Sequence, residues 1–467
     1  MANAFINFFK EPPSVDVIQD KEKVDKMYSH FRWRIFYSSF IAYVIFHICR
    51  KNIAVALPSM GDALNLSNTQ LGLLGTSLYV TYGIGKFING MLADRSNVRT
   101  FLPSALILSA VCNLCFVLSA IFVTPGHVSF FGLPSSTVLL WLLCFFWGAN
   151  GWFQSMGFPP VAKSLSYWFS NSERGTKWSL WSTSHQIGVF SAVMISGYVI
   201  ENFGWKAAFY VPAFICILTG IWLFDRLRDK PQSLGLPDIE EYKNEPKAQY
   251  EEEEKDSRTY FQIFRENILC NPVIWMLAIA YVFVYIIRFG TEDWLVKYLV
   301  EVKGNPLTFA SSKLSSLALI GAFGAILAGT ISDKIFKGNR TPINLIFLIC
   351  LILSLLAFAA NPSQNHVWDF IYAAMIGMFT AGPQMLIGGL CAVESSSKKV
   401  ASAATGFTGV FGYVGAALSS GGTGFMVDKF GWNGAIIFWA VSIVICIIIC
   451  TNLLVYEKIN KKSKEIT

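Results

Sequence analysis

Long apolar runs recur along this chain, and they constrain its fold more than any other feature. Each run is about as long as a helix needs to be to cross the hydrocarbon core of a bilayer. Hydrophobic residues make up 54% of the 467 residues and charged residues only 14%, too few charges to cover a soluble protein of this length. The sequence therefore predicts an all-α polytopic membrane protein with twelve transmembrane helices. The runs lie near residues 33–50, 71–92, 101–123, 137–160, 178–200, 207–224, 272–298, 310–331, 342–360, 367–393, 403–427 and 434–456.

Basic residues are concentrated in alternate loops. They are absent from the loops around 58–68, 124–136 and 361–367. The positive-inside rule therefore predicts that both termini and the long central loop are cytoplasmic. The same loops explain the net charge of +7, so we expect no nucleic-acid partner. The loops rich in basic residues contain Arg95 and Arg99, Lys163, Arg174 and Lys177, Arg226, Arg228 and Lys230, and Lys334, Lys337 and Arg340.

Two features concern processing and covalent structure. Residues 1–32 are polar and precede the first apolar run, so we expect no cleaved signal peptide. The ten cysteines lie mostly within apolar runs, so we expect helix packing rather than a disulfide framework.

The two halves of the chain repeat each other. Gly90-Met-Leu-Ala-Asp-Arg95 matches Gly329-Thr-Ile-Ser-Asp-Lys334, and Gln154 matches Gln384. Asn202-Phe-Gly-Trp205 matches Lys429-Phe-Gly-Trp432. A duplicated transporter of this kind binds its substrate near mid-membrane, between its repeats. We therefore predict a tail at 1–32, a six-helix half at 33–224, a cytoplasmic loop at 225–271, a pseudo-symmetric second half at 272–456 and a tail at 457–467.

One arginine in each half stands within an apolar run. Arg50 belongs to the first run and Arg288 to the seventh. A guanidinium at membrane depth costs at least roughly 2.5–3.5 kcal/mol, so a retained one is expected to bind an anion or a partner. Its planar pair of donors matches two oxygens of a phosphate monoester. We predict that both arginines bind the substrate, although Glu292, four residues after Arg288, offers a local ion pair as the alternative.

Polar-tipped aromatic residues accompany the two arginines at helical spacing. Tyr43, His47 and Arg50 are spaced i, i+4, i+7, and Tyr82 and Lys86 are spaced i, i+4. Trp181 and His185 are also spaced i, i+4, while Tyr285 and Arg288 are spaced i, i+3. These spacings put each pair on one helix face. Ordinary aromatic packing, or a satisfied packing histidine, is the alternative for each.

The remaining charged clusters are expected to stabilise parts of the protein rather than to contact the substrate. Asp94, Arg95 and Arg99, and their counterparts Asp333, Lys334 and Arg340, are expected at cytoplasmic helix ends, where they would fix loops and latch one state. The acidic run from Glu251 to Glu254 is typical of a solvated linker face. The sequence contains no phosphate loop, no metal-ligand spacing and no catalytic triad, so we predict neither an enzyme nor a cofactor or metal.

The repeated Gly-x-x-x-Asp-Arg/Lys loops resemble those of the major facilitator superfamily. The chain also contains Arg50-Lys-Asn52, Tyr82-Gly-x-Gly-Lys86, Glu173-Arg-Gly-Thr176, His185, Arg288-x4-Asp-Trp294 and Gly382-Pro-Gln-Met-Leu-Ile-Gly388. Together these motifs resemble the organophosphate:phosphate antiporter family of that superfamily. Asp229 to Pro237 and Lys334 to Arg340 resemble its hexose-phosphate branch, while residues 404–415 also resemble the glycerol 3-phosphate carriers.

The resemblance implies a fold, a site and an activity. It places Tyr43, Tyr82, Phe158, Trp181, Tyr285 and Tyr413 near the substrate, with Arg50, Arg288, Lys86 and His185. It implies a monomeric antiporter in a bacterial inner membrane that exchanges a sugar phosphate, glucose 6-phosphate, for inorganic phosphate.

Three alternatives stay open from the sequence. One is a sensor of external hexose phosphate that signals to a membrane kinase. Another is a glycerol 3-phosphate antiporter, because residues 404–415 resemble those carriers. Ala416, Ala417 and Leu418 stand where some hexose-phosphate antiporters carry an acidic/basic pair, which weakens the assignment of one sugar. The third is a proton-coupled carrier that would use Glu292 or Asp293.

Overall fold

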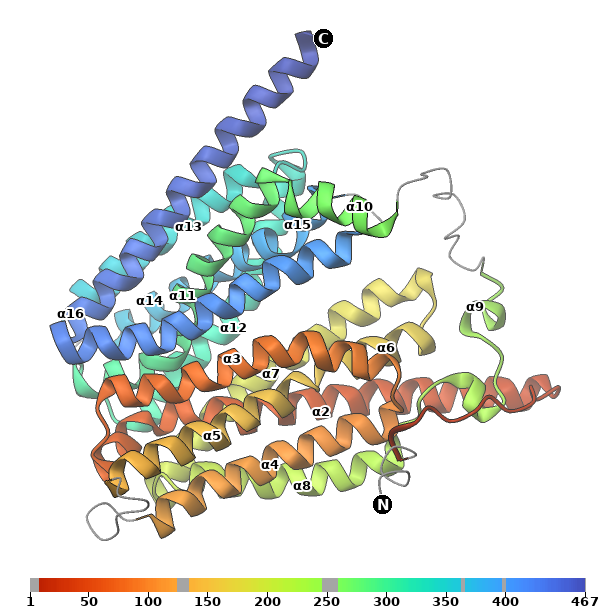
Figure 1. Cartoon of the computed structure of the whole chain (residues 1–467), viewed down its shortest axis with the longest axis horizontal. Coiled ribbons are helices and arrows are strands. Elements are labelled where there is room, and N and C mark those ends of the chain that lie inside the picture. Colours follow the sequence, from red (N-terminus) through yellow and green to blue (C-terminus); the bar gives the residue numbers. More distant parts are fainter. Residues whose placement is uncertain (1–7, 124–133, 246–258, 363–365, 397–399, 467) are drawn as a thin grey trace. The chain divides into compact units, whose positions relative to one another are not determined.

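The computed structural model of the chain is built almost entirely from helices (Figure 1). It describes residues 8–123, 134–245, 259–362, 366–396 and 400–466, so the predicted linker face at Glu251 to Glu254 lies outside the described residues. The long helices are α2 (Lys21–Leu64), α3 (Asn68–Asp94), α4 (Val98–Phe122), α5 (Ser135–Ser155), α6 (Phe158–Trp168), α7 (Asn171–Phe203), α8 (Ala207–Arg226), α11 (Pro272–Glu301), α12 (Leu307–Lys334), α13 (Thr341–Ala360), α14 (His366–Met385) and α16 (Ala401–Ile466). The short ones are the 3₁₀ turn η1 (Pro231–Leu234), α9 (Ile239–Tyr242), α10 (Tyr260–Phe264), α15 (Cys391–Glu394), and the π-helical turns η3 (Arg265–Leu269) and η4 (Leu386–Leu390).

The predicted all-α membrane architecture is confirmed. Within the described residues, nine helical stretches are long and apolar enough to cross a bilayer. The long helices α3 and α7 are more polar, and α16 consists of two arms. Counting these as well gives the twelve segments that the apolar runs predict.

Two glycines at equivalent places in the repeat end or bend helices. Gly204 follows α7 with φ 79°, and Gly431 interrupts α16 with φ 67°. A residue with a Cβ is strained at such φ values, whereas glycine adopts them readily. The repeated Phe-Gly-Trp sequence is therefore explained by two matching reversals of the chain.

The first transmembrane helix is much longer than its apolar run. The sequence predicts a span at 33–50, but α2 begins at Lys21 and ends at Leu64. Arg50 therefore lies inside a continuous helix rather than near its end. Hydropathy reports only the part of a helix that crosses hydrocarbon, and α2 continues beyond that part in both directions.

The described helices form two compact units. Unit 1 contains residues 1–52, 81–192 and 206–257, and unit 2 contains residues 53–80, 193–205 and 258–467. The helix α2 passes from one unit to the other between Asn52 and Ile53. Unit 2 thus includes parts of α2, α3 and α7 from the first half of the sequence.

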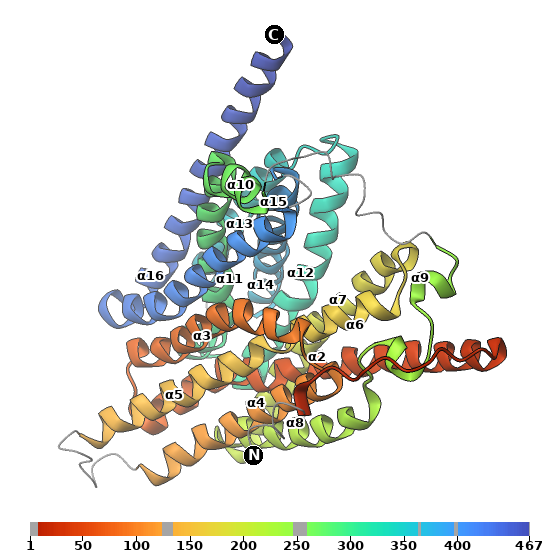
Figure 2. The same ribbon diagram turned by 45° about the vertical axis from the view of Figure 1, so that its right-hand side comes forward.

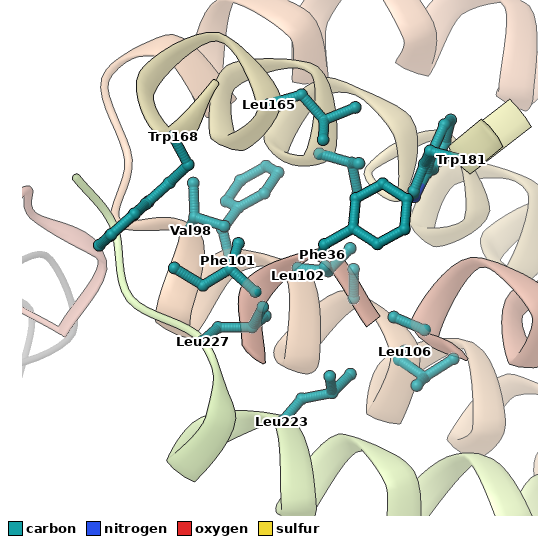
Figure 3. Packing of buried hydrophobic residues seen from close by; sticks show 14 of the residues in the cluster. Phe36, Val98, Phe101, Leu102, Leu106, Leu165, Trp168, Trp181, Leu223 and Leu227 are labelled. Carbon is teal, nitrogen blue, oxygen red and sulfur yellow. The ribbon is translucent and has the colours of Figure 1, made fainter. Parts of the chain in front are cut away.

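The core of unit 1 is formed by large side chains from helices far apart in sequence (Figure 3). Phe36 of α2, Leu102 of α4, Trp168 of α6 and Leu223 of α8 are all at most 5% exposed. Helix α4 lies beside both α5 and α8 (Figure 2). This core includes the part of α2 that precedes Arg50.

The segment at 229–237, which resembles the hexose-phosphate branch, connects several parts of unit 1. The carboxylate of Asp229 accepts a 2.8 Å hydrogen bond from the backbone N–H of Val98 at the start of α4. The carbonyl of Asp229 accepts another from the indole of Trp168 at 3.1 Å. Gly235 has φ 73°, and a Cβ there would lie 2.8 Å from the carbonyl oxygen of Asp16. The motif thus connects the N-terminal segment to the start of α4 and the end of α6.

Unit 2 contains two carboxylates that cap helix starts across the repeat. Asp428, in the first arm of α16, accepts hydrogen bonds from the backbone N–H groups of Asn68 at 3.0 Å and Thr69 at 2.6 Å, at the start of α3. Glu201, near the end of α7, accepts one from the N–H of Thr308 at 2.7 Å, at the start of α12. A carboxylate near a helix N-terminus accepts hydrogen bonds from the unpaired N–H groups and interacts favourably with the helix dipole. Both contacts join a helix of the first half to one of the second.

We expect Asp428→Ala to loosen the start of α3. Loss of such a cap costs about 1 kcal/mol, so the amides of Asn68 and Thr69 should exchange with deuterium about fivefold faster. The exchange is measured by mass spectrometry on the purified protein. The matched control is Asp62→Ala, which removes an exposed carboxylate near the end of α2. Equal exchange rates in the two variants would show that the Asp428 cap carries no stability.

Candidate functional site

Arg50 of α2 is the centre of a polar and aromatic cluster in unit 1. One guanidinium nitrogen lies 2.5 Å from Nε2 of His47, one turn earlier on the same helix. The other ring nitrogen of His47, Nδ1, lies 2.8 Å from the carbonyl oxygen of Tyr43. The guanidinium carbon lies 5.5 Å from the ring centroid of Tyr82 of α3. Such a cation–π contact stabilises the charge without neutralising it.

Aromatic rings from three helices extend this cluster. Tyr43 packs on Trp181 of α7 with ring centroids 4.7 Å apart, and on Phe158 of α6 at 6.5 Å. His185 of α7 stacks on His47 at 4.5 Å. The structure therefore brings together six predicted site residues of the first half, namely Tyr43, Arg50, Tyr82, Phe158, Trp181 and His185. The seventh, Lys86, lies one turn after Tyr82 on α3, and its side chain is exposed.

A buried amide network holds α2 in place around Arg50. Gln154 donates to the carbonyl of Phe46 at 3.0 Å, and Asn150 donates to the carbonyl of Cys49 at 3.0 Å. Asn113 also donates to Cys49, at 3.1 Å, and accepts from Asn52 at 2.9 Å. Hydrogen bonds between buried amide groups and backbone carbonyls favour one arrangement of the chain. The repeated Gln154 was the sequence signal for this network, but its role as an anchor for α2 was not predicted.

Arg288 of α11 is the corresponding centre in unit 2. Its Nε lies 2.9 Å from a carboxylate oxygen of Glu292, so the predicted alternative of a local ion pair is present. The guanidinium carbon also lies 4.9 Å from the ring centroid of Phe289 and 5.6 Å from that of Tyr285. The surroundings of Arg288 therefore combine a carboxylate with aromatic faces.

Tyrosines of unit 2 adjoin Arg288. The rings of Tyr285 and Tyr413 of α16 are 5.9 Å apart, which brings together the predicted residues Arg288, Tyr285 and Tyr413. Tyr281, which was not predicted, lies 3.1 Å from Tyr285 between hydroxyl oxygens. A Cβ at Gly388 would lie 2.0 Å from its ring, and one at Gly412 would lie 2.9 Å away. These two glycines therefore make room for the Tyr281 ring.

Tyr79 and Asp293 form a second unpredicted contact in unit 2. The Tyr79 hydroxyl donates to the Asp293 carboxylate at 2.5 Å, and Asp293 is only 7% exposed. The Tyr79 ring also packs against Phe289 at 4.5 Å. These residues are 214 positions apart in the chain, so no local pattern could have paired them.

The predicted loop clusters lie at helix ends. Arg340 binds both Asp333 and Glu394, the latter at 3.0 Å, and so connects the end of α12 to α15. Arg99 donates to the carbonyl of Phe224 at 2.7 Å and connects α4 to α8. Asp94 and Arg95 lie exposed at the end of α3, as Lys334 does at the end of α12. Their predicted latching role remains a prediction.

The arrangement suits binding rather than covalent chemistry. Each unit presents a guanidinium beside tyrosines, which matches a tetrahedral dianion carrying hydroxyl groups. Within the described ranges, three or more His, Cys, Asp or Glu side chains do not gather as a metal ion would require.

The family follows from a comparison with family models. Residues 39–420 match the model of the Major Facilitator Superfamily. The chain is a member of this superfamily. Among curated proteins, it is 41% identical to the probable hexose phosphate transport protein of Chlamydia pneumoniae, over 92% of this chain and 93% of that one. It is 38% identical to the glycerol-3-phosphate transporter of Bacillus subtilis strain 168, over 95% and 96%.

Two further comparisons identify the family within the superfamily and the fold. The chain is 35% identical to the membrane sensor protein UhpC of Escherichia coli K12, over 91% of this chain and 93% of that one. These relatives confirm the predicted organophosphate:phosphate antiporter family, whose members are transporters or sensors and not enzymes. The crystal structure of a bacterial homologue of the human lysosomal transporter Spinster has a TM-score of 0.69 at 18% identity and covers 90% of this chain and 96% of that one. It confirms the predicted major facilitator fold.

Proposed function

We propose that this membrane protein is an antiporter that exchanges glucose 6-phosphate for inorganic phosphate. The observation that carries the proposal is the setting of Arg50, which is held by a ring nitrogen of His47 and the face of Tyr82. These two contacts orient the guanidinium beside a tyrosine ring, and neither of them neutralises its charge. The relatives named for hexose phosphate transport support the choice of substrate class.

Arg50 and Arg288 are proposed to bind the phosphate group during the cycle. A phosphate monoester is close to doubly negative at neutral pH, so two guanidiniums match its charge and its oxygen geometry. The hydroxyls of Tyr43, Tyr82, Tyr285 and Tyr413 would bond phosphate or sugar oxygens. His185 and Lys86 would supply further donors, and Phe158 and Trp181 would exclude water.

The proposed mechanism is rocker-switch alternating access. Without an anion, a charged guanidinium in the membrane is costly, so the empty protein should change state reluctantly. A bound anion removes this cost and allows the repeats to move around the site. An outward gradient of inorganic phosphate would then drive uptake of the ester, with no cofactor required. We further propose a monomer in a bacterial inner membrane with both termini in the cytoplasm, since the basic loops favour that orientation.

A sensor is the second candidate function. The similarity to the membrane sensor protein UhpC specifically favours it. A sensor would bind external hexose phosphate and signal to a membrane kinase. Reconstituted exchange of the ester for phosphate is expected of the antiporter and not required of a sensor.

The substrate assignment is tested by competition. In proteoliposomes that exchange labelled phosphate, we expect glucose 6-phosphate to compete at least about tenfold better than glycerol 3-phosphate, a difference of roughly 1.4 kcal/mol. Sites that hydrogen-bond hydroxyls reject analogues that lack them. Free glucose should not compete because it offers no anion to the arginines. Stronger inhibition by glycerol 3-phosphate would overturn the hexose assignment, and inhibition by free glucose would overturn the phosphate site itself.

A further inference from the structure

We infer that His47 is a positioning residue for Arg50: a neutral imidazole that aims the guanidinium at the substrate without cancelling its charge. The inference rests on the proposed function, in which Arg50 binds phosphate. It assigns a purpose to a histidine buried inside a membrane helix, only 1% exposed.

The hydrogen bonds fix the tautomer of His47. A backbone carbonyl can only accept, so Nδ1, which lies 2.8 Å from the carbonyl oxygen of Tyr43, carries the hydrogen. A guanidinium can only donate, so Nε2, at 2.5 Å from the Arg50 nitrogen, presents its lone pair. Both conditions hold together only for a neutral imidazole. A protonated ring would point an N–H at the guanidinium and repel it.

Packing keeps the ring in this orientation. The Tyr43 ring meets it at 5.0 Å with an interplanar angle of 66°, and the His185 ring stacks on it at 4.5 Å with an angle of 29°. On α7, a Cβ at Gly188 would lie only 2.9 Å from the Cβ of His47. The helix backbone therefore approaches His47 closely, and the ring has little room to turn. A rigid acceptor holds one guanidinium nitrogen and orients the planar group.

The second arginine is oriented by different chemistry. Arg288 contacts Glu292, and the carboxylate of Glu292 offsets part of the positive charge available to a phosphate. The neutral imidazole of His47 orients Arg50 by accepting a hydrogen bond from the guanidinium, and this contact does not offset the charge. Loss of the His47 acceptor should weaken phosphate binding even though the charge of Arg50 remains.

Three substitutions separate the acceptor from the packing. His47→Gln can place a carboxamide oxygen near the position of Nε2, whereas the shorter His47→Asn reaches only the Nδ1 side. His47→Phe keeps a ring and removes both polar atoms. We expect Gln to bind inorganic phosphate within about threefold of the wild type, and Asn and Phe to bind at least about tenfold more weakly, as for loss of a hydrogen bond to a charged group. The control is His30→Asn, which changes an exposed histidine of α2.

The measurement is titration calorimetry of inorganic phosphate into the purified full-length protein in detergent, with the thermal unfolding midpoint of each variant as a check on folding. Rescue by Gln but not by Asn supports the positioning role. Equal affinity of the wild type, Asn and Phe would overturn it and leave the proposed function intact. Equally weak binding by Gln, Asn and Phe would also overturn it, because the acceptor that Gln supplies would then fail to restore binding. Failure of the wild type to bind phosphate would overturn the proposed function together with this inference.

Discussion

Arg50→Lys is expected to reduce phosphate exchange by at least about 100-fold while the protein still folds and inserts. Lysine keeps the positive charge but loses the planar pair of donors that matches two phosphate oxygens. It also cannot keep both the bond to His47 and the geometry over the Tyr82 ring. Loss of such a charge-assisted contact costs about 2.7 kcal/mol, which corresponds to that factor. The measurement is exchange of labelled phosphate in proteoliposomes.

The control for this experiment is Arg265→Lys, which makes the same chemical change at an exposed position in the π-helical turn η3. It should exchange phosphate about as fast as the wild type. Equal amounts of each variant in the vesicles, checked by immunoblot, exclude a failure of insertion. Near-normal exchange by the Arg50→Lys variant would remove Arg50 from the binding site.

The sequence predicts the fold well because hydrocarbon imposes simple rules. A spanning segment must be long, apolar and helical, and these properties are visible in one stretch of chain. The ends of the helices are not visible in this way. Helix α2 continues as far as Leu64, and α14 passes into the π-helical turn η4 at Leu386. Water and packing decide these features, and hydropathy does not report them.

The candidate site could likewise be predicted only in part. Residues within one or two turns of each arginine could be predicted, because Tyr43, His47 and Arg50 share a helix face. The local ion pair of Arg288 with Glu292 was foreseen for the same reason. The contact between Tyr79 and Asp293 could not be predicted, since it depends on how separate helices pack. The amide anchors of α2 at Gln154 and elsewhere depend on packing as well.

Uptake of the ester is expected to require phosphate on the opposite side of the membrane. The return step with an empty site would close the repeats over the guanidiniums without an anion. An uncompensated guanidinium in the membrane costs at least roughly 2.5–3.5 kcal/mol. Return with a bound anion avoids this cost, so exchange should exceed net uptake by at least about 100-fold. This requirement separates an antiporter from a proton-coupled carrier, which would use Glu292 or Asp293 and need no phosphate inside.

The most direct test of this account is uptake of labelled glucose 6-phosphate into proteoliposomes loaded with phosphate and into matched vesicles loaded with sulfate of equal ionic strength. Both are compared with vesicles that contain no protein. Obligatory exchange predicts rapid uptake into the phosphate-loaded vesicles and almost none into the others. Equal uptake into phosphate-loaded and sulfate-loaded vesicles would contradict obligatory exchange for phosphate. Uptake no faster than in protein-free vesicles would contradict transport and favour the sensor.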